Sequence, residues 1–234
     1  MRTSVLNALT TFIWRMIRLN FLFAVANTVL IVTILTIPLS TLTLPVYILG
    51  AFLFVPTLIA LLLAMKRLDD ESPPMRKLYF TCYREEFQGS MRFAIAYVIG
   101  ALILLAAFVF AQDLPTPIPI VPLYVLLSVL LYVHFIFGLV IRISFIIDVK
   151  GTWRLGLYCI SKYPLIALYI LAGTFAIWAI VPIMPFLIPF GIIPAAFYLL
   201  LFTTKKMIRN ISDVLNITKN KQEEESIESE DDSK

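Results

Sequence analysis

Long stretches without a charged residue dominate this chain of 234 residues. Four of them are close to the length of one membrane crossing: residues 19–37, 44–65, 93–111 and 123–141. An α-helix rises about 1.5 Å per residue, so about 20 apolar residues cross a hydrocarbon core about 30 Å thick. Each stretch therefore predicts one membrane-spanning helix. The composition agrees, since 60% of the residues are hydrophobic and 15% are charged, whereas soluble domains average about 25% charged residues.

The last uncharged stretch, residues 163–204, is about twice as long as one crossing requires. Three prolines interrupt its middle: Pro182, Pro185 and Pro189. Because proline in a helix interior removes a hydrogen bond and clashes with the preceding turn, we expect two spans, over residues 163–181 and 187–204. The alternative is one span plus a re-entrant segment buried against neighbouring helices. The predicted fold is an all-α bundle of six transmembrane helices, the fourth extending to Arg142.

Basic residues fall on one side of these predicted spans. All 19 lysines and arginines lie before the first span, between the second and third, from the end of the fourth to the fifth, or after the sixth. The opposite connections, residues 38–43, 112–122 and 182–189, contain none. Lysine and arginine accumulate in cytoplasmic loops. The pattern therefore predicts a multi-pass protein of the cell membrane with both termini in the cytoplasm, and the lipid bilayer as a partner.

Two segments outside the spans have the periodicity of amphipathic helices. Residues 1–18 are predicted to form an interfacial helix before the first span. Residues 72–88 are predicted to form a cytoplasmic amphipathic helix, because Ser72 and Pro73 suit a helix start and Gly89 suits a stop. This helix is expected either to pack on the membrane surface or to dock a partner. The candidate partner surface comprises Lys77, Arg84, Glu85, Glu86 and Phe87.

The chain ends in two segments of opposite charge. Residues 205–221 are mainly basic and follow the sixth predicted span on the cytoplasmic side. Residues 222–234 contain seven acidic residues, one basic residue and no aromatic residue. Such a composition cannot bury enough apolar surface to fold, so this tail is predicted to be disordered.

Three polar residues in the spans are candidates for function, because polar and ionisable side chains are costly in a membrane. His134 and Asn27 each lie 11 residues inward from the outer end of a predicted span, near the bilayer centre. We expect them to approach each other, either as a structural hydrogen bond between helices or as part of a path for a substrate or proton. Arg142 is expected to reach lipid headgroups. The alternative is that it forms an internal ion pair, and Asp148 lies six residues further along the chain.

Motifs for phosphate binding, zinc hydrolysis and serine hydrolysis are absent from the sequence. The chain has a single histidine, and its two cysteines, Cys82 and Cys159, do not have the spacing of metal ligands. The net charge of +4 comes from residues that set the topology and not from one basic face. We therefore expect no enzymatic activity, no cofactor, no metal and no nucleic-acid partner.

Four short runs in the first hundred residues resemble a known family: residues 14–20 (WRMIRLN), 55–61 (VPTLIAL), 66–67 (KR) and 83–87 (YREEF). Together they are similar to the YesL-type family, a group of bacterial integral membrane proteins of unknown function. The positions that carry this resemblance are Asn20, Pro56, Thr57, Glu85, Glu86 and Phe87. The resemblance implies an accessory role beside carbohydrate ABC transporters and no established activity.

Two classes of function follow. In the first, the protein is a non-enzymatic accessory or scaffold subunit whose cytoplasmic helix docks an ABC transporter permease or another membrane protein. In the second, it is a small transporter or channel with a polar path through Asn27 and His134. A transporter requires a hydrated cavity that reaches these residues, with helices broken near the bilayer centre, whereas an accessory subunit can have a dry bundle. Small residues such as Ala96 and Gly100, or Ala172 and Ala176, permit close helix packing in either class. A homo-oligomer is compatible with both classes.

Overall fold

A computed structural model describes residues 2–38, 40, 43–68, 74–112, 120–145, 147–180, 182–183 and 192–231. Every regular element in these ranges is an α-helix, so the all-α prediction is confirmed for this part of the chain. The helices are α1 (Arg2–Ala26), α2 (Thr28–Thr36), α3 (Leu44–Lys66), α4 (Met75–Gln112), α5 (Ile120–Ser144), α6 (Val149–Lys162), α7 (Pro164–Ile180) and α8 (Ile192–Asp231).

Three helices, α3, α4 and α5, are long and apolar enough to cross a membrane. Two more crossings are added if each bent pair counts as one: α1 with α2, bent by 67°, and α6 with α7, bent by 95°. The described residues thus give three to five candidate crossings, which indicate a membrane location. The sixth predicted span, 187–204, begins outside the described residues, and α8 covers its remainder from Ile192. Six crossings and cytoplasmic termini therefore stay predictions.

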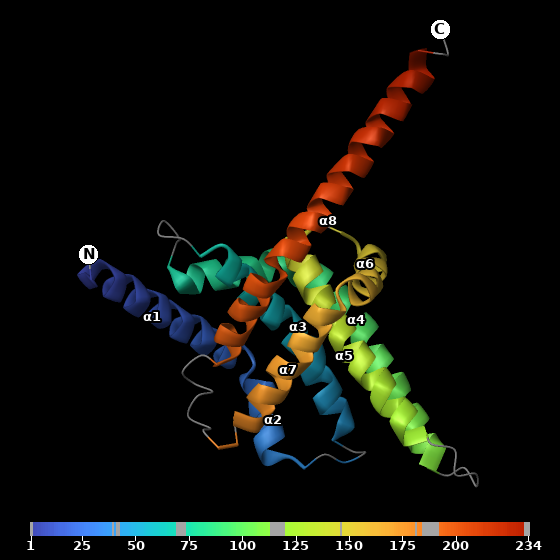
Figure 1. The fold of residues 1–234 in the computed structure, drawn as a ribbon. Helices are drawn as coiled ribbons and strands as arrows, with labels where there is room; N and C mark the ends of the chain where they lie inside the picture. The colour runs from blue at the N-terminus through green and yellow to red at the C-terminus, as the bar shows by residue number, and fades with distance from the viewer. Residues whose placement is uncertain are drawn as a thin grey trace.

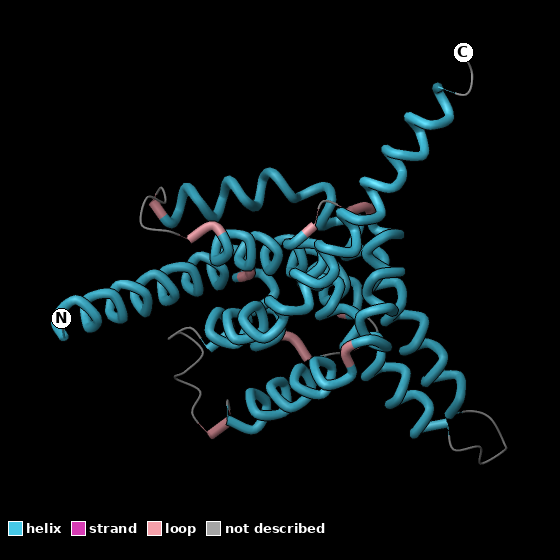
Figure 2. The backbone as a smooth tube through the Cα atoms, turned by 45° about the horizontal axis from the view of Figure 1, so that its top comes forward, coloured by secondary structure: helices cyan, strands magenta, loops and turns pink. Residues whose placement is uncertain are grey.

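Several helices change direction near one end of the molecule (Figure 1). The first part of α4 runs across the molecule, and its second part descends beside α5. The α6–α7 pair has a similar shape, with α6 lying across and α7 descending. Pro164 accounts for the bend of this pair, because it disfavours helical geometry at the preceding Tyr163, which has φ −126° and ψ 57°. The C-terminal helix extends away from the other helices in both views (Figure 2).

Helix α4 combines two elements that the sequence predicts as separate. The expected stop at Gly89 is wrong, because α4 runs from Met75 to Gln112 and joins the predicted helix 72–88 to the third span. A side chain at position 89 would clash with the guanidinium group of Arg142. Gly89 therefore leaves room for the Arg142 side chain against α4 and does not end the helix. The expected helix start at Ser72 lies outside the described residues.

Helix α1 also crosses a predicted boundary. It continues past residue 18 to Ala26, so the chain bends at Asn27 and not between the interfacial helix and the first span. Asn27 has φ −103° and ψ 14°, and α2 begins directly after it. The nine residues of α2 are too few to cross a bilayer alone. The first predicted span, 19–37, is thus bent near its middle.

The acidic tail differs from its prediction as well. The sequence predicts disorder over residues 222–234, whereas α8 continues to Asp231. Glutamate, glutamine and lysine are strong helix formers, and the tail extends an existing helix without a new nucleation step. Helical propensity of the backbone therefore outweighs the low hydrophobicity on which the prediction of disorder rested. Residues 232–234 lie outside the described part of the chain.

The core lies in the C-terminal parts of α3 and α5. Every residue of α3 from Val55 to Met65 is buried, but in the preceding part of α3 only Gly50 is. In α5, the residues from Val133 to Ile141 are buried apart from the half-buried Phe135. By contrast, no residue of 98–110 in α4 or of 121–132 in α5 is buried. Both main polar clusters described below lie in or at the edge of this packed region.

Candidate functional site

His134 is the centre of a polar cluster formed by α4, α5 and α6. Its Nδ1 lies 2.7 Å from the Tyr97 hydroxyl oxygen, and its Nε2 lies 3.0 Å from the backbone carbonyl oxygen of Trp153. Because a carbonyl oxygen only accepts hydrogen bonds, Nε2 carries the ring proton and donates it to Trp153. Nδ1 then accepts the Tyr97 proton, so a neutral imidazole uses both of its nitrogens. Only 2% of His134 is exposed.

Aromatic rings and two glycines hold this cluster in place. The rings of Tyr97 and Trp153 stack with centroids 5.0 Å apart, and the Trp153 ring lies 4.6 Å from the ring of His134. A Cβ atom at Gly156 would lie 2.7 Å from Nε2 of His134, and one at Gly138 would lie 2.7 Å from the Tyr97 hydroxyl. Cβ contacts this short do not occur in real structures. Both glycines are therefore needed for the three helices to approach as closely as they do.

Asn27 belongs to a second buried cluster, with Thr57 of α3. Its Nδ2 donates hydrogen bonds to the Thr57 hydroxyl and to the Phe23 carbonyl, each at 2.8 Å. The Thr57 hydroxyl has one proton to donate, and its nearest acceptor is the Phe54 carbonyl at 2.6 Å. Asn27 is 4% exposed and Thr57 is 2% exposed. The Asn27 side chain therefore ties the bend between α1 and α2 to the middle of α3.

The family-like positions in α1 and α3 are all buried: Asn20, Pro56 and Thr57. Pro56 lies inside α3, where it contributes no backbone N–H to the helix. The Tyr79 hydroxyl of α4 donates to the backbone carbonyl of Thr57 at 3.2 Å. Since Thr57 of α3 also bonds to Asn27, this one residue connects α3 to α4 and to the bend between α1 and α2.

Asn27 and His134 do not form the pair that their shared depth predicts. Asn27 bonds to α3, whereas His134 bonds to α4 and α6. Each side chain is satisfied by a different set of helices. Depth along a span can be calculated from the sequence, but depth does not specify which faces of two helices meet.

Arg142 points toward α4. Its Nη2 donates to Oε2 of Glu86 at 3.1 Å, and its side chain is 11% exposed. Its Nε is buried without a hydrogen-bond partner among the described residues. Asp148 does not pair with it but caps α6, because its Oδ1 accepts from the Gly151 amide at 2.9 Å. The predicted reach of Arg142 to lipid headgroups is therefore replaced by an internal pair that joins α5 to α4.

Two further basic residues lie at the same end of the molecule. Lys66 donates from Nζ to the Ile143 carbonyl at 2.8 Å, which satisfies a backbone acceptor in the last turn of α5. Arg67 donates to Glu85 at 2.7 Å, and this hydrogen bond raises the pKa of the guanidinium group. Both side chains of the Arg67–Glu85 pair are about half exposed, at 46% and 48%. Such a pair contributes about 0–1 kcal/mol to stability.

These contacts divide the candidate partner surface into two parts. Glu85 and Glu86 are already paired with arginines of this chain. Phe87 is half-buried and packs on a neighbouring tyrosine ring, with centroids 5.3 Å apart. Lys77 and Arg84 are exposed. The outward face of this part of α4 is thus more basic than the sequence suggests.

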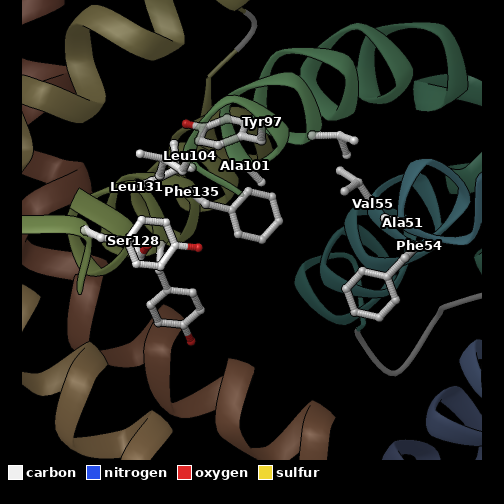
Figure 3. Close-up of a pocket in the computed structure, with 12 residues that line it drawn as sticks. Ala51, Phe54, Val55, Tyr97, Ala101, Leu104, Ser128, Leu131 and Phe135 are labelled. Atoms are coloured by element: carbon white, nitrogen blue, oxygen red, sulfur yellow. The ribbon is translucent and has the colours of Figure 1, made fainter. Parts of the chain in front are cut away.

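An open groove of about 350 Å³ lies between α3, α4 and α5 (Figure 3). The residues from α3 face those from α4 and α5 across it. Its mostly apolar lining consists of Ala51, Phe54, Val55, Tyr97, Val98, Ala101, Leu104, Tyr124, Ser128, Leu131, Tyr132 and Phe135. Asn27 and His134 do not line the groove, but Tyr97 both lines it and bonds to His134.

Sequence reasoning missed the partners of both polar candidates. Tyr97 and Trp153 lie in apolar or amphipathic segments where aromatic residues are common, and Thr57 was selected only by family resemblance. The sequence does give a physical reason to expect such partners. A buried polar side chain in lipid requires hydrogen-bond partners, so His134 implies nearby donors and acceptors even where the sequence does not say which.

The described residues contain no group of three or more histidine, cysteine, aspartate or glutamate side chains that could hold a metal ion. Cys82 and Cys159 are buried free thiols. Comparison with known proteins finds no matching family model, no matching curated protein and no matching solved structure. The resemblance to the YesL-type family therefore stays a prediction.

Proposed function

We propose that this chain is a non-enzymatic, multi-pass protein of the cell membrane that serves as an accessory or scaffold subunit. The observation that carries the proposal is the bonding of His134 and Asn27, which are buried and have their hydrogen bonds made within the chain. A residue that moves a proton or binds a solute needs access to water or ligand. A residue that joins helices needs only its partners.

The proposed docking surface is the outward face of the first part of α4. Lys77 and Arg84 are exposed there, whereas the neighbouring acidic residues are paired within the chain. A partner with acidic loops on the same side of the membrane would complement this face. The proposed partner class, a permease of a carbohydrate ABC transporter, follows from the family resemblance alone.

The alternative, a small transporter or channel, is favoured by two observations. The chain bends by 67° at Asn27, near the middle of the first predicted span. Tyr97 connects the groove between α3, α4 and α5 to His134. In this alternative, rotation of the Tyr97 ring would open a route from the groove to the imidazole.

Co-purification in a mild detergent, followed by mass spectrometry, tests the proposed function. We expect a permease to be recovered with the wild type and lost with the double variant Lys77→Glu, Arg84→Glu. The double variant Lys205→Glu, Lys206→Glu has the same change of charge at exposed positions of α8 and should retain the permease. A wild-type protein without a permease that binds a small solute, with binding lost in Tyr97→Phe, would contradict the accessory role and support the transporter.

A further inference from the structure

We propose that the exposed face of α6 binds the headgroups of anionic phospholipids. This inference goes beyond the accessory role, and it rests on the proposed orientation in which α6 lies at the cytoplasmic leaflet. That leaflet carries a negative surface potential that attracts basic segments next to the membrane.

Helix α6 has two distinct faces. Its buried side, formed by Thr152, Gly156 and Cys159, packs against the core. The exposed residues recur at helical spacing on the opposite side: Lys150, Arg154, Leu157, Tyr158 and Ser161, with the exposed Lys162 at the end of the helix. Leu157 is 52% exposed and Tyr158 is 49% exposed. Basic side chains beside large apolar ones are typical of a helix that lies in the interface, where the apolar groups enter the acyl region and the cations stay at the headgroups.

The position of α6 agrees with this role. The 95° bend lays α6 across the start of α7 (Figure 1). Large apolar residues of α7 are exposed directly after the bend, including Leu165 at 73%, Leu168 at 62% and Tyr169 at 70%. If α7 crosses the membrane, these side chains contact acyl chains. The 95° bend then places α6 along the membrane surface at the level of the headgroups.

Charge complementarity identifies the headgroup. Among the described residues, neither Lys150 nor Arg154 forms a salt bridge, and each is exposed. The nearest acid in sequence, Asp148, uses Oδ1 to cap the helix. A phosphatidylglycerol headgroup supplies the missing negative charge, whereas phosphatidylcholine also brings a cation that the arginine and lysine repel.

Lipid titration of the full-length protein in neutral detergent, read by native mass spectrometry, tests this site. The probes are dioleoyl phosphatidylglycerol, dioleoyl phosphatidylcholine and glycerol 1-phosphate. We expect the wild type to prefer phosphatidylglycerol, and the double variant Lys150→Gln, Arg154→Gln to bind it about 10- to 30-fold more weakly, since each basic residue near the surface contributes about tenfold or less. The single variant Arg154→Gln should lose about half of this effect on a logarithmic scale.

The matched control is Lys205→Gln, Lys206→Gln, which removes the same charge from exposed positions of α8 and should bind phosphatidylglycerol like the wild type. Equal binding of the two lipids, an equal loss in the control, or competition by glycerol 1-phosphate alone would overturn the proposal. Failure of the accessory role is seen separately, as the absence of a permease in the co-purification. A reporter fused after Lys234 tests the orientation independently.

Discussion

The long helices have a packed half and an open half, although both halves are apolar. The packed half contains residues 55–65 of α3 and 133–141 of α5, and the open half contains residues 44–54 of α3, 98–110 of α4 and 121–132 of α5. In α3, the residues from Val55 to Met65 are buried without interruption, whereas Leu53 is 37% exposed. In α5, Leu139 is fully buried and Leu126 is 63% exposed. Lipid tails are as apolar as leucine, so hydrophobicity does not drive helices together within a membrane. Among the described residues, hydrogen bonds between helices help to hold the packed half, as at His134 and Arg142.

Glycine and polar side chains mark this difference. In the packed half, Gly156 lies against His134 and Gly89 lies against Arg142. In the open half, Gly173 has nothing within 4 Å of its Cβ position. A hydrogen bond of 2.7 Å joins Tyr132 to Thr174, but it is exposed. The same residue types therefore have different consequences in the two halves, and paired substitutions can measure them.

The largest expected difference comes from matched leucines in α3. Leu61→Ala should lower the free energy of unfolding by about 3 kcal/mol, because it leaves a cavity in a fully buried site. Leu53→Ala should cost less than about 1 kcal/mol, because lipid can fill the space at a site that is 37% exposed. Equilibrium unfolding in mixed detergent micelles measures both values. Equal losses would remove the distinction between the two halves.

Two glycine substitutions should have opposite signs. Gly156→Ala should destabilise the protein by about 2 kcal/mol, because the new Cβ would lie 2.7 Å from Nε2 of His134 and force the ring away from its partners. Gly173→Ala has open space and should be neutral or stabilising by up to about 1 kcal/mol through helix propensity. Thermal unfolding of the two variants in one detergent decides the sign. A stable Gly156→Ala protein would show that α6 is not closely packed on His134.

Two tyrosine substitutions should differ by less. Tyr97→Phe removes the donor to Nδ1 of His134 and leaves a buried acceptor unpaired, which should cost about 1 kcal/mol. Tyr132→Phe breaks only the exposed bond to Thr174 and should cost close to zero. Both variants remove one hydroxyl group, so the unfolding titration compares the same chemical change at a buried site and at an exposed site. A larger loss for Tyr132→Phe would contradict the assigned roles.

The smallest expected effect is the coupling between Asn27 and Thr57. A double-mutant cycle with Asn27→Ala and Thr57→Ala should give a coupling energy of about 0.6 kcal/mol, the average for hydrogen bonds between membrane helices. A cycle with Asn27→Ala and His134→Ala should give no coupling, because the two side chains bond to different helices. Coupling in the second cycle with none in the first would restore the polar path through both residues.

The sequence predicts much of this architecture from length and charge alone. Stretches without charge are enough to locate α3 and α5, because the thickness of a bilayer sets the length of a crossing. Gly89 led to a wrong prediction of where the helix ends. A glycine that ends a helix and a glycine that makes room for a neighbouring side chain look the same in one sequence. The bend at Asn27 was missed for a similar reason, because asparagine inside an apolar run carries no local stop signal.

The candidate site was predicted in part. Single polar residues in lipid are conspicuous, so Asn27, His134 and Arg142 could be selected from the sequence. Their partners could not, because pairing depends on helix rotation and on contacts between segments distant in sequence. Glu86 shows this limit, since it lies 56 positions from Arg142 in the chain, and the Arg142 side chain meets it in the space that Gly89 leaves open.

Photolabelling of the wild-type protein by the lipid that surrounds it after reconstitution tests the contrast between the packed half and the open half most directly. The protein is reconstituted with a phospholipid that carries a diazirine in its acyl chain, irradiated and digested, and the adducts are located by mass spectrometry. We expect adducts on residues 99–110 of α4 and 121–132 of α5, and none on residues 55–65 of α3 or 136–141 of α5. Adducts spread evenly along α3 and α5, or confined to the buried segments, would contradict a bundle that is closed in one half and open to lipid in the other.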